Sequence, residues 1–513
     1  MRRRDLFRTG AGLAAMQAVG SAAPAPLEIG DNLYRSIGVR PIINARGTFT
    51  IITGSQTLPE VKRAMDIASR SFVNMDELMD AVGKRLAELS GAEWGIVTAG
   101  CAAGLTHCTA AAIAGGNPER MQRMPTLSGL KSEVIVPEYS HNVYDHAIRM
   151  LGVKLVVVKN KVDLANAFNE RTAMAYILAG PNDDGPLGTR VVSELTKRHG
   201  IPLVVDAAAE VLMLKPNVHL ERGATVVAYS GGKCIRGPQA AGLLFGEKKF
   251  LQGAWINSAP HHAFGRSLKV GKEEIMGMLA AVEMWAKRDH KAEWAMWESW
   301  LNEIAISVKR VPGVTTEVRQ PSADLSNRTP ELVVQWDAAK VGVTGQDLFR
   351  HLLETEPRIN LARSAANSVA VVPYQMQAGD QKVVADRLYA ALSKPPKFEA
   401  APAASAPAVQ VAGVWEATIE FVYGSAKHRL VFEQDGARLT GAHEGEFASG
   451  DLSGTVSGTR VKFQSSLPTD GQRVSFTFDG AAEGGKMSGT VALGEYGEAR
   501  WSAERHSYRG RRG

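Results

Sequence analysis

The sequence is poor in cysteine and has no long apolar run, and each absence excludes a class of protein. Only three of its 513 residues are cysteines, Cys101, Cys108 and Cys234. They are too few and too clustered for a disulfide framework or a metal site, so we interpret them as small packing residues and expect no metal. The sequence has no stretch of about 18 apolar residues, which argues against a membrane-spanning helix.

The chain also lacks an excess of positive charge outside its two ends, although its net charge is +6. Four arginines against Asp5 give residues 1–23 a charge of +3, four arginines give residues 505–513 a charge of +4, and the rest of the chain carries −1. A nearly neutral body argues against a broad nucleic-acid surface, and we expect no nucleic-acid partner. The length, with 45% hydrophobic and 22% charged residues, predicts a globular chain of two or three domains.

Residues 1–25 have the pattern of an export signal. Arginines open the chain, a weakly apolar stretch of small residues follows at 10–20, and SAA at 21–23 precedes prolines. The stretch RRDLF at 3–7 resembles a twin-arginine signal, which exports proteins that are already folded. We therefore expect an exported, periplasmic protein, with a disordered basic tail as the alternative.

The middle of the chain is expected to be a large α/β region. From Trp94 onward, short apolar runs alternate with helical stretches, which predicts βαβ units and a mainly parallel sheet. Seven buried strands are expected, at 94–98, 133–136, 154–158, 173–178, 202–206, 224–229 and 242–245.

Three features follow the carboxyl ends of these strands, where open α/β sheets bind ligands. The first is the small-residue turn TAGCAAG at 98–104, which leads into a helix whose free amides can hold a phosphate. The second is Asp206, which ends the apolar run 203–205, and the third is Lys233, which lies between two apolar runs. Taken singly, each feature has an ordinary structural explanation. The small residues of the turn also allow close helix packing, Asp206 can be a helix cap, and Lys233 can be a solvated loop lysine.

Together the three features predict a site for pyridoxal phosphate. This cofactor needs a lysine for its Schiff base, a carboxylate opposite the pyridine nitrogen and a helix N-terminus for the phosphate. The chain supplies the turn, then Asp206 and, 27 residues later, Lys233. This order and spacing resemble those of fold-type I pyridoxal phosphate enzymes.

The stretch around the lysine gives a closer resemblance. SGGKCIRGPQAAG at 230–242 is similar to the lysine motif of the selenocysteine synthase (L-seryl-tRNA selenium transferase) family. Stretches at 43–48, 58–65 and 265–272 agree as well, most of all with the branch that includes D-glucosaminate-6-phosphate ammonia-lyase. The resemblance covers residues 30–395. It implies the fold-type I fold, with a seven-stranded, mainly parallel sheet in an N-terminal arm and large domain at 26–270, an α+β small domain at 271–395, and at least a homodimer.

The resemblance also implies residue roles. Lys233 corresponds to the Schiff-base lysine and Asp206 to the partner of the pyridine nitrogen. The phosphate is expected at Ser230, Gly100, Cys101 and Ala102. His141 falls where this fold places a ring stacked on the cofactor, with a structural histidine as the alternative. The candidates for substrate recognition are Arg266, Arg358 and Arg363.

The cofactor's chemistry and this branch of the family predict an ammonia-lyase. Once the amine of an amino acid or amino-sugar acid displaces Lys233, the lysine is expected to remove the α-proton; a group on the β-carbon then leaves, and ammonia is released. β-Replacement of the selenium transferase type, transamination and racemisation use the same residues. Selenium transfer is disfavoured because TGSQ at 53–56 and Lys269 replace arginines of the selenium transferases, and because we expect no separate tRNA-binding domain.

The C-terminal region has a different pattern. Residues 396–411 form a Pro/Ala linker, after which the apolar pattern changes to period two. We expect strands at 415–422, 428–433, 460–464 and 473–478, and turns at Asp435-Gly436, Asp470-Gly471 and Asp479-Gly480. A Leu/Met-Thr/Ser-Gly repeat recurs at 439–441, 452–454 and 487–489. Residues 412–508 are therefore predicted to form an all-β barrel or sandwich, similar to lipocalin-like modules. A non-catalytic exported binding protein, with this module as its working part, is the alternative of another class.

Overall fold

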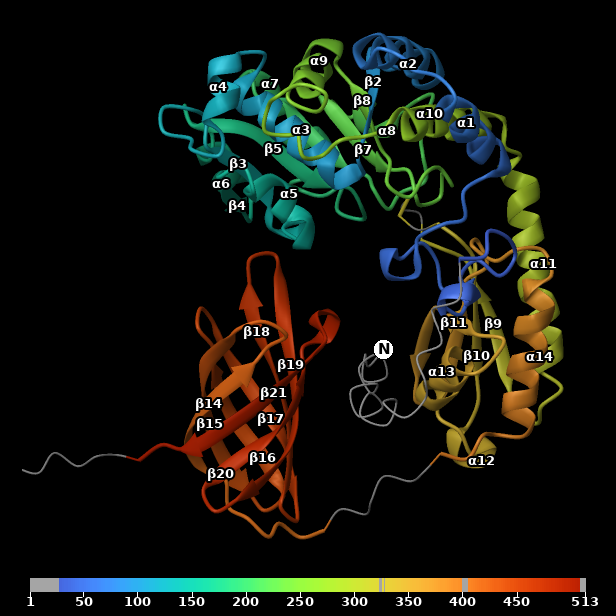
Figure 1. Cartoon of the computed structure of the whole chain (residues 1–513), viewed down its shortest axis with the longest axis vertical. Helices are drawn as coiled ribbons and strands as arrows, with labels where there is room; N and C mark the ends of the chain where they lie inside the picture. Colours follow the sequence, from blue (N-terminus) through green and yellow to red (C-terminus); the bar gives the residue numbers. More distant parts are fainter. Residues whose placement is uncertain (1–26, 323–324, 327, 399–404, 508–513) are drawn as a thin grey trace, which may run out of the picture. The chain divides into compact units, whose positions relative to one another are not determined.

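A computed structural model of the chain describes residues 27–322, 325–326, 328–398 and 405–507. The predicted export signal at 1–25 lies outside the described residues. The described chain falls into two compact units, one at Gly38–Lys397 and one formed by the part from Phe398 onward with the residues before Gly38 (Figure 1). None of the described helices combines the length and the apolar character that crossing a bilayer requires.

The first unit is built on a sheet with the strand order β2-β8-β7-β6-β5-β3-β4. Every neighbouring pair is parallel except the two that involve β8, which is antiparallel to both β2 and β7. The strands are β2 (Trp94–Thr98), β3 (Glu133–Pro137), β4 (Lys154–Val158), β5 (Thr172–Leu178), β6 (Leu203–Asp206), β7 (Val226–Ser230) and β8 (Gly242–Gly246). All seven predicted strands are present within two residues of their expected bounds, so the mainly parallel sheet is confirmed.

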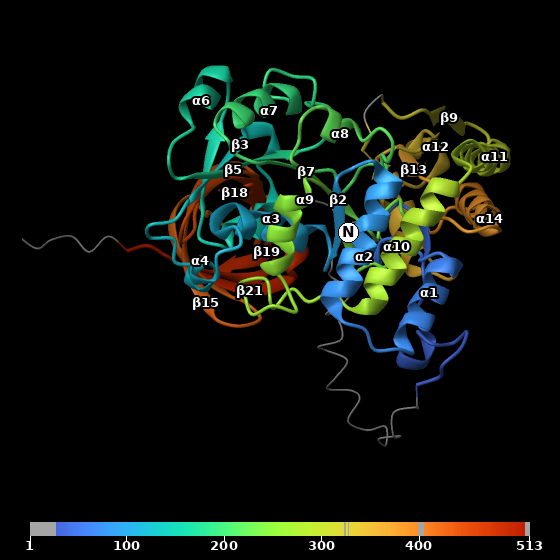
Figure 2. The ribbon, with the colours of Figure 1, turned by 90° about the horizontal axis from the view of Figure 1, so that it is seen from above.

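The sheet forms from apolar runs because helices cover it. Every residue of β2, β3, β6 and β8 is buried, as expected for strands covered on both faces. Helices α1 (Pro59–Ser69), α2 (Met75–Ser90) and α10 (Lys272–Lys287) lie side by side (Figure 2). The other helices of this domain are α3 (Cys101–Ala114), α4 (Pro118–Arg123), α5 (His146–Arg149), α6 (Lys161–Asn166), α7 (Thr189–Arg198), α8 (Val218–Glu221) and α9 (Lys248–Ile256).

Helix α3 crosses the sheet and contacts five of its strands. Its sequence, CAAGLTHCTAAAIA, consists mostly of small residues, and nearly all of them are buried. Small side chains let the helix approach the strands closely. Cys101 and Cys108 are buried free thiols in this helix, and Cys234 is a free, half-buried thiol, which agrees with their interpretation as packing residues.

The small domain packs a four-stranded sheet against two long helices. The sheet order is β12-β13-β10-β9, and α11 and α14 lie side by side (Figure 1). The N-terminal arm belongs here in part, because β1 (Ile43–Ala45) pairs in parallel with β11 (Ile359–Leu361). The remaining elements are β9 (Thr315–Arg319), β10 (Glu331–Gln335), β12 (Arg363–Ala365), β13 (Ser368–Val371), α11 (His290–Val308), α12 (Ala338–Val341), α13 (Gly345–Glu354) and α14 (Asp380–Ser393).

The C-terminal unit is a closed barrel in which each strand pairs with the next along the chain, and β21 pairs with β14. Its interior is filled by large side chains such as Trp415, Phe478 and Trp501. This result selects the barrel over the sandwich. The strands are β14 (Gly413–Glu420), β15 (Ser425–Asp435), β16 (Arg438–Glu444), β17 (Ser449–Ser457), β18 (Arg460–Thr469), β19 (Gln472–Glu483), β20 (Lys486–Ala492) and β21 (Glu498–Arg505).

The predicted turn at Asp479-Gly480 is wrong, because both residues lie inside β19. Asp479 accepts two hydrogen bonds of 2.8 Å from Arg460 on the neighbouring strand, so its carboxylate stabilises a strand pair. The Leu/Met-Thr/Ser-Gly repeat also lies within strands, namely β16, β17 and β20. A Cβ on Gly441 would lie 1.9 Å from the carbonyl oxygen of Val431, so glycine is needed there for close strand approach.

Candidate active site

The predicted site residues gather at the carboxyl edge of the large sheet. Asp206 ends β6, and Ser230 ends the neighbouring parallel strand β7. Because β8 runs in the opposite direction, it begins at this edge. Its first residue, Gly242, pairs with Ser230 on one side and with Thr98 on the other. The turn after Thr98 therefore lies two strands away from Ser230 on the same edge.

The turn after β2 leads directly into α3. Its N-cap, Gly100, has φ +89°, a conformation that favours glycine, and no described side chain caps the helix. The first N–H groups of a helix have no partner within it and carry partial positive charge. The amides of Cys101 and Ala102 belong to this first turn, and Ala102 is exposed. They are placed to bind an anion, as predicted for the phosphate.

Gly242 allows this turn to lie against the sheet edge. A Cβ at Gly242 would lie 2.3 Å from the carbonyl carbon of Gly100 and 2.5 Å from the amide nitrogen of Cys101. Both distances are far shorter than van der Waals contact, so only glycine permits the observed approach. The start of α3 is thereby fixed beside the ends of β7 and β6.

Asp206 is a buried carboxylate with three hydrogen-bond donors. Ala208 N donates to its Oδ1 over 2.9 Å and the thiol of Cys101 donates over 3.5 Å, while the hydroxyl of Tyr176 donates to Oδ2 over 3.3 Å. Burial raises the pKa of the Asp206 carboxyl above its ordinary value, and the donors offset this only in part. A cationic partner would therefore stabilise its ionised form.

Lys233 is half-buried in the loop between β7 and β8. The N-terminal arm holds this loop: Ser55 N donates to Gly232 O and Leu58 N donates to Arg236 O, each over 3.1 Å. The ammonium of Lys233 acts on the Asp206 carboxylate and partly offsets the rise in its pKa. The structure thus brings Lys233, Asp206 and the start of α3 into one site.

His141 follows β3 and has a fixed ring. Its Nδ1 is hydrogen-bonded to the buried carboxylate of Asp145, which also accepts from Asn142 N over 3.0 Å. The side chain of His141 is 24% exposed, so one part of the ring still faces solvent. An anchored, partly exposed ring is compatible with stacking on a cofactor, and this role stays a prediction.

The three arginines predicted to recognise the substrate lie apart from one another. Arg266 is exposed in a turn. Arg358 donates to the carbonyl oxygens of Leu353, over 2.6 Å, and Arg40, over 3.1 Å. Arg363 is an exposed residue paired with Glu331. None of the three lines the cavity beside Lys233; the described arginines that do are Arg236, Arg288 and Arg328.

The cavity beside Lys233 has a volume of about 330 Å³. It is lined by the lysine loop, the loop after Asp206, the start of α11 and the loop after β13. The lining includes four aromatic residues, Trp285, Trp294, Trp297 and Tyr374, and two buried polar residues, Thr48 and Gln375. None of the six was among the predicted site residues. The sequence holds one signal for them: Trp294 and Trp297 are three residues apart and therefore share a helix face.

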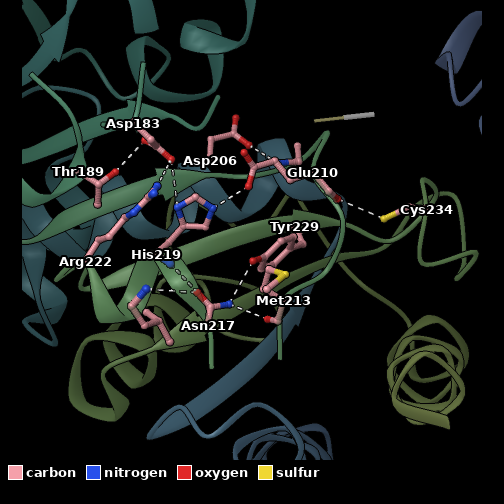
Figure 3. Close-up of polar contacts among 12 residues, drawn as sticks. Asp183, Thr189, Asp206, Glu210, Met213, Asn217, His219, Arg222, Tyr229 and Cys234 are labelled. Atoms are coloured by element: carbon pink, nitrogen blue, oxygen red, sulfur yellow. Dashed lines mark hydrogen bonds and ion pairs between the residues drawn. The ribbon is translucent and has the colours of Figure 1, made fainter. Parts of the chain in front are cut away.

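A second buried polar cluster joins Asp183 to residues that follow Asp206 along the chain (Figure 3). His219 Nε2 lies 2.7 Å from Glu210 Oε2, its Nδ1 lies 3.5 Å from Asp183 Oδ2, and Arg222 donates to Asp183 over 3.1 Å. Asp183, Glu210 and His219 offer ligand atoms within 4.8 Å of one another, as a metal site does. Because Arg222 already neutralises Asp183, we interpret the cluster as an ion-pair network. The carbonyl of Glu210 accepts from the thiol of Cys234 over 3.2 Å, which ties this network to the lysine loop.

The known proteins that the chain resembles in sequence and in fold are enzymes. The chain is 29% identical over 333 residues to D-glucosaminate-6-phosphate ammonia lyase of Salmonella typhimurium, covering 63% of this chain and 86% of that protein. It is 24% identical over 292 residues to L-seryl-tRNA(Sec) selenium transferase of Proteus mirabilis, covering 49% and 58%. A solved structure of D-glucosaminate-6-phosphate ammonia-lyase matches with a TM-score of 0.64 at 26% identity, covering 71% of this chain and 99% of its own. No protein-family model matches the chain.

The chain is similar in sequence and in fold to these fold-type I pyridoxal phosphate enzymes. The predicted family, fold and cofactor are thereby confirmed. The structure shows that the residues present fit the cofactor of a fold-type I enzyme. Asp206 is a buried carboxylate that favours a cationic partner, α3 offers amides to a phosphate, and no described heavy atom lies within 4 Å of a Cβ built on Gly100, so there is space for a ligand.

Proposed function

We propose that this fold-type I enzyme removes ammonia from an amino acid or amino-sugar acid by α,β-elimination. The observation that carries the proposal is the meeting of Lys233, the buried Asp206 and the start of α3 at one edge of the sheet. The relative that the chain matches over 86% of its length is named an ammonia lyase.

In this proposal each residue of the chain has a defined task. When bound, pyridoxal phosphate supplies an aldehyde for the substrate amine and a ring that withdraws electrons from the α-carbon. The Lys233 amine attaches the cofactor and later takes the α-proton. The Asp206 carboxylate holds a proton on the pyridine nitrogen. The amides of Cys101 and Ala102, with Ser230, bind the phosphate.

Selenium-transfer-type β-replacement is the second candidate, because the chain is also similar to a selenium transferase. Against it, TGSQ at 53–56 and the exposed Lys269 stand where that family carries arginines. Transamination and racemisation would use the same lysine. The products separate these reactions: elimination releases ammonia and a 2-oxo acid, β-replacement releases neither, and racemisation leaves the amino acid intact.

We further propose that the chain is exported by the twin-arginine route to the periplasm and acts as at least a homodimer. The arginine-rich pattern at 1–25 supports export. Support for a subunit contact comes from large exposed apolar side chains near the start of the first unit, namely Phe49, Ile51, Phe72 and Val73.

The test of the proposed function replaces the lysine. Purified full-length protein should show the visible absorbance of a lysine-bound cofactor, and borohydride should remove it. Lys233→Ala should lack this absorbance and lose on the order of 10²- to 10⁴-fold in ammonia release, because it has no base for the α-proton. Lys249→Ala, which changes an exposed lysine of α9 outside the cavity lining, is the matched control and should retain both properties. A wild-type protein that stays colourless after incubation with pyridoxal phosphate would overturn the proposal.

A further inference from the structure

Four aromatic side chains, those of Trp285, Trp294, Trp297 and Tyr374, line the cavity beside Lys233 together with charged side chains such as Arg236, Arg288 and Arg328. The aromatic part of this lining indicates what the cavity can receive. We propose that it receives the side chain of the substrate, and that this side chain carries an aromatic ring with a hydrogen-bonding group. The proposal rests on the proposed function, because Lys233 is taken to hold the cofactor to which the substrate amine binds. It goes further by naming the chemical class of the substrate.

The size of the cavity excludes a small side chain as its sole occupant. Its volume of about 330 Å³ is comparable with the share of liquid volume of roughly ten water molecules. Pockets from about 300 Å³ upward enclose drug-sized ligands. The hydroxymethyl side chain of serine would leave most of this space to water, whereas a ring-bearing side chain would fill much of it.

The walls are suited to an aromatic ring. The ring centroids of Trp294 and Trp297 lie 5.9 Å apart at 54°, and those of Trp297 and Tyr374 lie 6.3 Å apart at 71°. Tilted arrangements at these separations are the ones that aromatic rings prefer with one another, so an inserted ring can continue the series. Leu212 and Met213 add apolar surface to the lining.

Gln375 is a buried polar residue of the cavity lining whose side-chain amide has no partner among the described residues. It is only 4% exposed, and neither its Nε2 nor its Oε1 has a hydrogen-bond partner among the residues that the structure describes. Two other polar groups of the lining are engaged: the Tyr374 hydroxyl accepts from Thr48 N over 2.9 Å, and Arg288 donates to the carbonyl oxygen of Cys234 over 3.2 Å. An unpaired buried amide destabilises a protein, so a ligand that pairs with it gains affinity.

A phenol is the simplest group that satisfies this amide. Its hydroxyl can donate to Oε1 of Gln375 or accept from Nε2, and its ring matches the tryptophan walls. Tyrosine is therefore the probe of choice, and phenylalanine is the matched ligand that lacks only the hydroxyl. An amino-sugar acid such as D-glucosaminate offers hydroxyls without a ring and is the competing class.

The experiment measures binding of the three ligands, each amino acid as both enantiomers, to the full-length protein loaded with pyridoxal phosphate. The change in cofactor absorbance and in tryptophan fluorescence reports binding. One enantiomer of tyrosine should bind tighter than phenylalanine, and both tighter than D-glucosaminate. Gln375→Leu should weaken tyrosine binding about tenfold, the effect of one lost hydrogen bond to a buried group, and leave phenylalanine binding unchanged.

A stability measurement keeps the test independent of activity. Gln375→Leu should raise the melting temperature of the cofactor-free protein, because it removes an unpaired buried amide. The matched control is Gln381→Leu: Gln381 is 8% exposed, but its Oε1 accepts from Gly379 N over 2.8 Å, so this change should lower the melting temperature.

Two outcomes would overturn the inference. D-glucosaminate binding tighter than both aromatic amino acids would assign the cavity to a sugar acid. A lower melting temperature for Gln375→Leu would show that the amide has a structural partner. Either result leaves the cofactor absorbance of the wild type and its loss in Lys233→Ala intact, so failure here is distinguishable from failure of the proposed function.

Discussion

At the scale of single residues, Asp206 is held in an environment that opposes its own charge. It is a 3% exposed carboxylate whose pKa is raised by burial, although three donors and Lys233 lower it in part. In an enzyme that binds a cationic pyridine ring, such a residue stabilises the cofactor-bound protein and destabilises the cofactor-free protein. Binding of the cofactor can therefore offset the unfavourable ionisation of Asp206.

The effect of Asp206→Asn should differ between the empty and the loaded protein. Because the folded-state pKa of Asp206 is raised, the folded empty protein holds its proton to higher pH than the unfolded chain does. The stability of the cofactor-free protein should therefore fall as the pH rises from the pKa of Asp206 in the unfolded chain to its pKa in the folded protein. The fall should be smaller in Asp206→Asn. Thermal melts of cofactor-free protein across pH measure this difference.

The loaded protein should respond in the opposite sense to the same substitution. The neutral amide that Asp206→Asn introduces cannot neutralise a protonated pyridine nitrogen, so kcat/KM for ammonia release should drop on the order of 10²-fold, as for the loss of other preorganised electrostatic partners. If the stability of the cofactor-free wild type and of Asp206→Asn depended equally on pH, the prediction for the empty protein would be contradicted. An unchanged kcat/KM in the loaded variant would contradict the prediction for the loaded protein.

The residues that sequence could identify are those with local signals. Lys233 stands in a distinctive motif, and Asp206 directly follows an apolar strand, so both could be placed before the structure was known. Gln375 has no such signal, because its burial and its missing partner arise from packing between α11, the loop after Asp206 and the loop after β13. Arg358 and Arg363 were predicted only because enzymes of this fold often recruit a substrate-binding arginine from the small domain, and contacts with backbone carbonyls and Glu331 decide where they lie.

At the scale of elements, the meeting of β8 with the start of α3 sets the phosphate end of the site. We expect Gly242→Ala to disrupt it, because the added methyl would lie 2.3 Å from the backbone of Gly100. Overpacking of this kind costs about 1–3 kcal/mol. The measurable results are a lower melting temperature and a raised dissociation constant for pyridoxal phosphate. The control is Gly253→Ala in α9, where the nearest described atom is 3.6 Å from the new Cβ, and which should bind the cofactor normally.

Secondary structure was predictable where burial dictates composition. Six of the seven strands of the large sheet are apolar because helices cover them, and their positions follow from the runs alone. The edge strand β4 has an apolar run as well, but it was wrongly expected to be buried, because only one of its five residues is. Strand direction has no such signal, and the antiparallel β8 is set by the short loop that carries Lys233. The mistaken turn at Asp479-Gly480 has a similar cause, because its ion pair with Arg460 joins residues of two strands.

At the scale of the whole molecule, the chain contains an enzyme unit and a barrel with separate cores. The residues proposed for catalysis all lie in Gly38–Lys397. We therefore expect a chain ending at Lys397 to keep the cofactor absorbance and ammonia release of the full protein. If the truncated chain lost function while full-length Lys233→Ala kept it, the barrel would be the working part, as the binding-protein alternative requires.

The pairing of β14 with β21 has an evolutionary consequence. Since Trp415 lies opposite Arg505, the barrel's chain enters and leaves on adjacent strands, and closure leaves no backbone edge unpaired. A module with neighbouring ends behaves as a cassette: recombination can append it to an unrelated gene, move it to a surface loop or rejoin it at a different hairpin with little disturbance to the host. Related barrels fused to enzymes of quite different fold would be the genomic trace of such transfer.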